Sequence, residues 1–209
     1  MKKHRAILIG DTTTAKYHSM ARFIPEFQTI LKDFDLDVTE DYNAFLLEQL
    51  KPYDLCVCFI DRWTPLTEDQ SVGLIRYVRQ GGGLLVLHNG LSLQTRPELA
   101  KLLGGFFTGH PEEAVLTYQT IPSQPWITTE ISDFFALEEP YQIRLDNSFD
   151  GTVFLQYRWH ETLVPAGWTR LEGRGKIVVL SPGHHLETFL VEGYRTLIHR
   201  SAMWAIAQE

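Results

Sequence analysis

GGGLLVLHNG, residues 81–90, is the stretch that decides the fold of this 209-residue chain. Three glycines are followed by four apolar residues, and the run ends at His88 in front of Asn89-Gly90. A short apolar run between turn residues is typical of a strand buried on both faces, as in parallel sheets covered by helices. The pattern recurs in GKIVVLSPGHH, residues 175–185, which ends at His184 and His185.

Strand-like and helix-like segments alternate on both sides of this stretch. The expected strands are 5–10, 35–40, 53–60 and 84–88, and the expected helices are 21–33, 43–51, 67–80 and 97–103. This alternation predicts an α/β three-layer sandwich with a mostly parallel central sheet. We expect Ile7, Val57, Val86 and Val179 to lie in adjacent central strands.

The second half of the chain has a different pattern. The segments 114–121, 141–145, 152–159 and 163–171 are strand-like and separated by turn residues. They predict extra antiparallel strands at one edge or end of the sheet. Residues 176–180 resume the parallel pattern, and 192–208 are expected to form a final helix. No internal repeat or linker is visible, so we predict a single domain over residues 1–209.

Composition and charge narrow the class of protein. The apolar fraction of 44% and the charged fraction of 22% are ordinary for a globular protein. A net charge of −7 argues against nucleic acid or an anionic membrane as a partner. No apolar run has the length of a membrane span, and the basic start MKKHRAILIG lacks the long apolar stretch of a signal peptide. We therefore expect a cytoplasmic protein; homo-oligomerisation is left open.

Four segments in order resemble the trehalose-utilisation (ThuA-like) family. They are GGGLLVLHNG, LLGGFFTGHP, ITTEISDFFALEEPYQI and PAGWTRLEGRGKIVVLSPGHHLETF. The resemblance covers residue 53 to the C-terminus and implies a class I glutamine-amidotransferase-like, flavodoxin-type fold with a role near sugar catabolism. His88, His110 and His184 match family histidines. Glu139 and Tyr141 match an acid-then-tyrosine pattern of the family. Pro140 between them differs from the commoner form of that pattern.

The chain is not expected to be a glutamine amidotransferase. That reaction needs a cysteine nucleophile on a strained strand-to-helix turn. The turn here is His88-Asn89-Gly90, whereas Cys56 and Cys58 lie inside another expected strand. Two positions apart on a strand, these cysteines share one face and do not easily form a disulfide, which indicates buried thiols.

The histidines at strand ends are the main candidates for chemistry. Carboxyl ends of neighbouring parallel strands line the ligand crevice of such folds, so we expect His88 and His184 in one cleft. Imidazole takes and returns protons near neutral pH. We expect one of the two to act as general base or acid on a sugar hydroxyl or an adjacent carbon acid, helped by Glu139 or Asp11. The alternative for each histidine is packing or binding a loop carbonyl.

Substrate contacts are expected from five further residues: Asp11, Trp63, Asn89, His110 and Tyr141. Asp11 lies in the polar loop after the first strand, where capping a turn is its alternative role. Trp63 follows the cysteine-bearing strand, and an aromatic face can stack on a sugar ring.

A divalent metal, most simply zinc, is the one cofactor that the sequence leaves open. Its expected ligands are His18, His88 and His184, because neutral imidazole nitrogens bind zinc. No glycine-rich phosphate loop follows a strand and opens a helix, so no tightly bound nucleotide is expected.

Three function classes follow. The favoured one is a carbohydrate-modifying hydrolase, isomerase or lyase, acting on trehalose, another disaccharide or a keto-sugar by acid–base chemistry without a cysteine nucleophile. The second is a non-catalytic sugar-binding or regulatory module on the same fold. The third is another small-molecule hydrolase or isomerase. All three take a small-molecule ligand, and turnover measured beside binding separates the first two.

Overall fold

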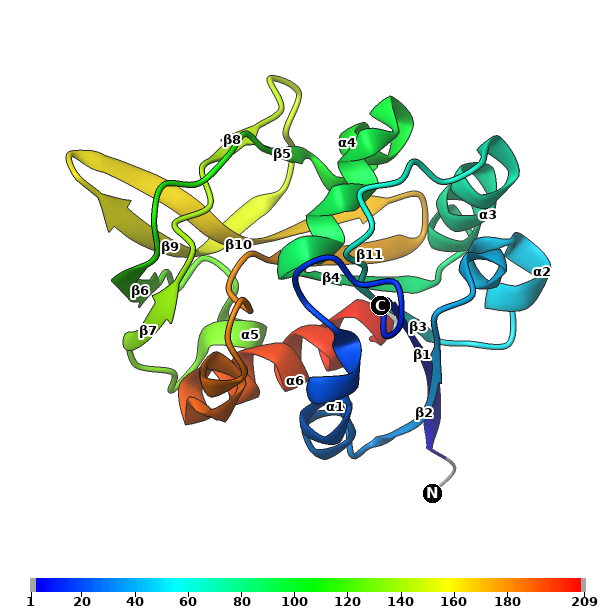
Figure 1. Cartoon of the computed structure of the whole chain (residues 1–209), viewed down its shortest axis with the longest axis horizontal. Helices are drawn as coiled ribbons and strands as arrows, with labels where there is room; N and C mark the ends of the chain where they lie inside the picture. Colours follow the sequence, from blue (N-terminus) through cyan, green and yellow to red (C-terminus); the bar gives the residue numbers. More distant parts are fainter. Residues whose placement is uncertain (1–2, 208–209) are drawn as a thin grey trace.

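A nine-stranded sheet runs through the computed structural model of the chain, which describes residues 3–207 (Figure 1). Its strand order is β2-β1-β3-β4-β11-β10-β9-β6-β7. The first five strands are parallel: β2 (Phe34–Thr39), β1 (His4–Gly10), β3 (Leu55–Phe59), β4 (Gly83–Leu87) and β11 (Gly175–Leu180). This is the flavodoxin order, with its topological switch point between β1 and β3. The predicted fold class is confirmed, and Ile7, Val57, Val86 and Val179 lie in four adjacent strands.

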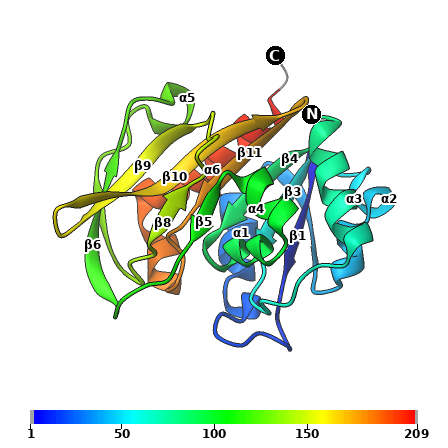
Figure 2. The ribbon, with the colours of Figure 1, turned by 90° about the horizontal axis from the view of Figure 1, so that it is seen from above.

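The remaining four strands extend the sheet beyond β11. They are antiparallel to their neighbours: β10 (Thr162–Glu172), β9 (Thr152–Trp159), β6 (Ala114–Thr120) and β7 (Phe134–Glu138). Figure 2 shows this extension on the side of the molecule away from β1 and β3. Three of the four expected antiparallel strands, within 114–121, 152–159 and 163–171, are therefore present at one edge of the sheet.

Two details of the extension differ from the sequence expectation. Only Ile143–Leu145, β8, is a strand within 141–145, and it pairs with β5 (Gly105–Phe107) in a separate two-stranded sheet. Strand β7 was not expected. Phe135 and Leu137 fill its outward positions and are 66% and 47% exposed, so the segment shows no alternation of polar and apolar residues.

Helices cover both faces of the parallel strands. Successive residues of a strand point to opposite faces of the sheet, so they pack in two separate cores. Leu85 packs in one core with Leu197, and Val86 packs in the other with Leu74. The first face carries α1 (Ile24–Ile30), α5 (Pro125–Thr128) and α6 (Glu192–Ile206). The second face carries α2 (Leu47–Leu50), α3 (Glu68–Arg79) and α4 (Pro97–Leu103). In Figure 1, α1 and α6 lie together below the sheet. Within residues 3–207, no helix is both long and apolar enough to cross a bilayer.

Three helices are shorter than their apolar patterns suggested. The segment 21–33 divides into a 3-10 turn, Met20–Arg22, and α1, because Pro25 has no N–H and belongs in the first turn of a helix. The segment 43–51 likewise divides into a 3-10 turn, Tyr42–Phe45, and α2. The last helix ends at Ile206.

A capping box begins α3 and provides a local stability test. The Thr67 hydroxyl accepts the Gln70 N–H at 3.3 Å, and Gln70 Oε1 accepts the Thr67 N–H at 3.0 Å. Thr67→Ala should lower the free energy of unfolding by about 1 kcal/mol, because it leaves the Gln70 N–H without its partner. Thr67→Ser keeps the hydroxyl and should retain most of the stability. Equal urea midpoints for Thr67→Ala and the wild type would contradict the role of this cap.

Candidate functional site

The candidate site lies at the carboxyl edge of the parallel strands, where loops from separate parts of the chain meet. His18 lies in the loop after β1, and Asp61 follows β3. His88 comes directly after β4, and His184 follows β11 by four residues. Parallel strands bring these ends together, so side chains far apart in the sequence become neighbours.

His88 occupies the strand-to-helix turn and is fully buried, with a left-handed backbone conformation at φ 43°. Its Nδ1 is 2.8 Å from the Ser181 carbonyl oxygen, which only accepts, so the proton is on Nδ1. Its Nε2 is 3.2 Å from the Tyr141 hydroxyl. Burial lowers the pKa of His88 to about 4. The side chain is therefore a neutral imidazole with an Nε2 lone pair.

His18 and His184 contact each other, and each is backed by a carboxylate. His18 Nε2 is 2.7 Å from His184 Nδ1. On their other sides, His18 Nδ1 is 3.1 Å from Asp61 Oδ1 and His184 Nε2 is 3.0 Å from Glu113 Oε1. Burial would raise the pKa of Asp61, but hydrogen bonds from the His18 side chain and the Tyr17 and His18 amides hold it at about 2.

Glu139 reaches into the same cluster from the turn after β7. Its Oε2 is 3.2 Å from His184 Nδ1 and 3.6 Å from His88 Nε2, and its Oε1 is 3.5 Å from His110 Nε2. Burial opposes ionisation, but His184 and His88 hold the pKa of Glu139 well below its usual range. Burial likewise would lower the pKa of His184, but its hydrogen bond to Glu139 and the nearby carboxylates raise it. A charged carboxylate thus lies among three imidazoles.

Glu138, which the sequence reasoning missed, holds the turn that carries His184. Its buried carboxyl group accepts the Gly183 N–H at 2.9 Å, the His184 N–H at 3.0 Å and the Thr188 hydroxyl. Burial raises the pKa of Glu138 to about 7 against these hydrogen bonds. Recognising 134–138 as a strand would have put Glu138 on the inward face, whereas Glu113 gives no signal in the sequence.

Asp11 was expected to help a histidine or bind substrate, and the structure places it among loop contacts instead. Its carboxylate accepts the Tyr42 hydroxyl and the Asp61 N–H, both at 2.7 Å, and the Thr14 hydroxyl at 3.0 Å. It also pairs with the Arg62 guanidinium. Across residues 3–207 no hydrogen bond joins Asp11 to a histidine, so its observed role is to hold the loops after β1 and β3.

Aromatic rings extend the cluster on one side. Tyr141 stacks on His88, with ring centroids 4.4 Å apart, and its ring centroid is 5.8 Å from that of His110. The ring centroid of Phe107 is 4.3 Å from that of Tyr141 and 5.6 Å from that of Trp63. Of the expected residues, Tyr141 contacts His88 directly and His110 lies beside Tyr141, whereas Trp63 is connected to them through Phe107.

Asn89, another expected substrate contact, is buried directly after His88. In the described part of the chain, neither polar atom of its amide has a hydrogen-bond partner. Buried polar groups are normally paired, so the unpaired amide of Asn89 is an exception in this part of the core.

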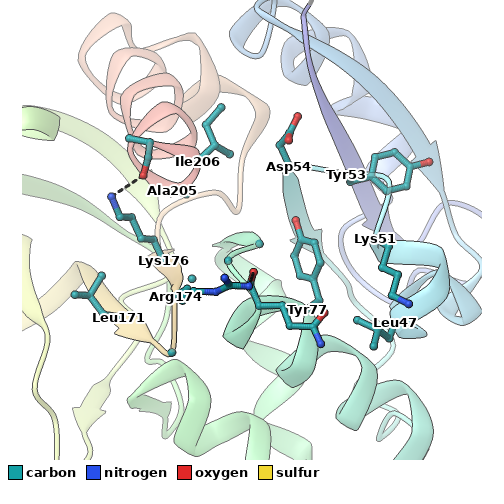
Figure 3. A pocket seen from close by; sticks show the side chains of 16 residues that line it. Leu47, Lys51, Tyr53, Asp54, Tyr77, Leu171, Arg174, Lys176, Ala205 and Ile206 are labelled. Atoms are coloured by element: carbon teal, nitrogen blue, oxygen red, sulfur yellow. Dashed lines mark hydrogen bonds between the residues drawn. The ribbon is translucent and has the colours of Figure 1, made fainter. Parts of the chain in front are cut away.

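A cavity of about 750 Å³ lies at the opposite, amino edge of the sheet (Figure 3). Its lining includes Asp54 and Gly82, which precede β3 and β4. The three cationic side chains there are engaged: Lys176 donates to the Ala207 carbonyl at 2.8 Å, Arg174 donates to the Gln80 carbonyl at 2.9 Å, and Lys51 pairs with Glu48. The histidine cluster is at the other end of the same strands.

Comparison with known proteins agrees with this fold. A ThuA-like protein from Parabacteroides merdae has a TM-score of 0.80 at 17% identity, over 99% of this chain and 91% of that one. One from Bacteroides uniformis has a TM-score of 0.76 at 20% identity, over 97% and 91%. A β-galactosidase from Rahnella sp. R3 has a TM-score of 0.65 at 13% identity, over 99% of this chain but 31% of that one. At these identities the likeness shows the fold alone. Curated protein sequences give no match.

The sequence itself matches the ThuA family model, described as trehalose utilisation, over residues 5–205. The match covers the sheet and the loops after its strands, including His18, His88, Glu139 and His184. The chain therefore belongs to the ThuA family.

Proposed function

We propose that this chain acts on a carbohydrate, either trehalose, another disaccharide or a keto-sugar, by acid–base chemistry without a cysteine nucleophile. The observation that carries the proposal is the convergence of His18, His88, His184 and Glu139, whose candidate ligand atoms all lie within 4.8 Å of one another. The description of the family supports the substrate class. The turn where an amidotransferase needs cysteine carries His88 instead.

Glu139 and His184 are the groups that we assign to proton transfer, with His88 in support. On a keto-sugar, the carboxylate takes the proton from the carbon next to the carbonyl, and the C–H electron pair forms the double bond of an enediol. An imidazole protonates the carbonyl oxygen, and reversal on the neighbouring carbon gives the isomer. Electrons balance within the substrate, so no oxidant is needed. General acid–base catalysis of this type contributes about 10²–10⁴-fold.

The polar and aromatic groups around the cluster would hold the sugar. Trp63 offers a half-buried ring beside Phe107, and Asn89, whose buried amide is unpaired within residues 3–207, is assigned as a further contact. His110 and Tyr141 are assigned as sugar contacts on the same side of the cluster. Asp11 acts indirectly, because it holds the loops after β1 and β3 in place. Cys56 and Cys58 are free thiols with sulfurs 3.9 Å apart, so a reducing, cytoplasmic location is part of the proposal.

The test is turnover of a panel of ordinary and oxidised disaccharides, measured beside calorimetric binding. We expect at least one member to be converted, and Trp63→Ala to raise KM for it about 10-fold, the equivalent of one lost stacking contact. Trp126→Ala is the matched control, because that side chain is 53% exposed on α5. Binding without turnover would indicate a sugar-binding module instead. Absence of both would contradict a carbohydrate role.

A further inference from the structure

The three clustered histidines share an arrangement that acid–base chemistry alone does not require. Each holds one ring nitrogen against a hydrogen-bond acceptor. His88 Nδ1 is 2.8 Å from the Ser181 carbonyl, and His18 Nδ1 is 3.1 Å from the Asp61 carboxylate. His184 Nε2 is 3.0 Å from the Glu113 carboxylate. The other nitrogen of each ring faces the centre of the cluster.

These outer acceptors fix the tautomers of His18 and His88. A carbonyl or carboxylate oxygen only accepts, so in a neutral ring the nitrogen beside it carries the hydrogen. The inner nitrogens of His18 and His88, both Nε2, then present lone pairs. The inner nitrogen of His184, Nδ1, lies 3.2 Å from Glu139 Oε2, so both nitrogens of that ring face carboxylates. The inner nitrogens of His18 and His184 are only 2.7 Å apart. Two nitrogens at that distance repel unless a proton or a cation lies between them.

We infer that His18, His88 and His184 bind one zinc ion through these inner nitrogens, with Glu139 Oε2 at the fourth corner. The inference deepens the proposed function, on whose site it rests, by assigning that site a metal. With zinc bound, the ion would polarise the carbonyl oxygen in place of the His184 imidazole, and Glu139 would take the proton with Oε1, the carboxylate oxygen that the metal leaves free. Ligands at about 2.0–2.1 Å from a tetrahedral ion are about 3.3 Å from one another. Glu139 Oε2 is 3.2 Å from His184 Nδ1 and 3.6 Å from His88 Nε2, close to that spacing.

The surroundings favour a cation of this kind. Histidine ligands in metal sites usually donate their outer N–H to a carboxylate or a backbone carbonyl, as all three do here. Asp61, Glu113 and Glu139 supply negative charge around the three imidazoles. Imidazole ligands suit zinc better than magnesium or calcium, which prefer oxygen.

The experiment measures metal binding directly. The full chain is stripped with a chelator, dialysed and titrated with Zn²⁺ by calorimetry. We expect one ion per chain and a higher Tm in the zinc-loaded protein. Replacement of Zn²⁺ by Co²⁺ should give the intense visible absorption of a four-coordinate site. A folded wild-type chain that binds no stoichiometric Zn²⁺ would overturn the inference and indicate a shared proton between His18 and His184.

Variants assign the ligands. His18→Gln should abolish stoichiometric binding. Asp61→Asn keeps one oxygen for the Tyr17 and His18 amides but removes the charge behind the His18 ring, so it should weaken binding about 10–100-fold. The control is His199→Gln, because His199 Nε2 also pairs with a carboxylate, Asp33, at 2.8 Å but away from the cluster. Unchanged binding in His18→Gln, or equal loss in His199→Gln, would refute the ligand set.

The two proposals fail in different ways. Zinc binding without turnover of any sugar would reject the proposed function and leave the metal site standing. Sugar turnover by a chain that binds no Zn²⁺ would reject the metal site and leave the function standing.

Discussion

Glu139→Gln should lower kcat/KM for the substrate by about 10²–10⁴-fold, the contribution typical of a general acid or base. The substitution preserves the shape of the side chain but removes the charge that lies 3.2 Å from His184 Nδ1 and 3.6 Å from His88 Nε2. Steady-state kinetics on the converted disaccharide gives the measurement. Thermal unfolding of the same sample checks that the fold is intact.

Glu161→Gln is the matched control for this loss. Glu161 is an exposed residue between β9 and β10, and the substitution is chemically identical. It should leave kcat/KM unchanged. If Glu139→Gln retained wild-type kcat/KM, Glu139 would have no part in proton transfer, and the carboxylate would serve only to orient the histidines.

Phe189→Ala should be among the most destabilising single substitutions, lowering the free energy of unfolding by about 3–5 kcal/mol. Phe189 is fully buried in the 3-10 segment after His184. Its ring centroid lies 5.1 Å from that of Phe23, 5.4 Å from that of Phe27 and 5.8 Å from that of Tyr194. Removal of the ring leaves a cavity between α1, α6 and the sheet that the close-packed neighbours cannot fill.

Leu190→Ala is the companion measurement, because Leu190 directly follows Phe189 but is 56% exposed. Its effect should stay within about 0.5 kcal/mol, as is usual for surface positions. Chemical denaturation of both variants gives the comparison. Similar midpoints for the two would show that the Phe189 cluster is not a rigid part of the core.

His88 shows how far sequence reasoning could reach within the site. Its position after an apolar run was enough to place it at the carboxyl end of a strand. Its full burial, its φ of 43° and its contact with the Ser181 carbonyl come only from the structure. A Cβ at Gly183 would lie 2.9 Å from His88 Cβ, so the histidine is packed as part of the core. Gln is therefore a better test substitution at His88 than Ala, which would leave a cavity.

The hydrogen-bond partners of the histidines could not be predicted. His18 and His184 are 166 positions apart, and Glu113 meets His184 across 71 positions. Asp61 is the exception, because it follows a buried strand in the same way as His88 and could have been included on that signal. Glu138 was hidden because its strand presents Phe135 and Leu137 outward.

The sequence by itself determined the parallel strands, their helices and the histidines at the strand ends, since burial on both faces imposes a local pattern of apolar residues and turns. Only the tertiary structure decided which ring nitrogen of each histidine faces the centre and which carboxylate lies behind it. Those contacts depend on loops that carry no periodic signal, and their geometry is set by the packing of strands distant in the sequence. Strand β7, which the sequence did not predict and which brings Glu139 to the histidines, belongs to the same category.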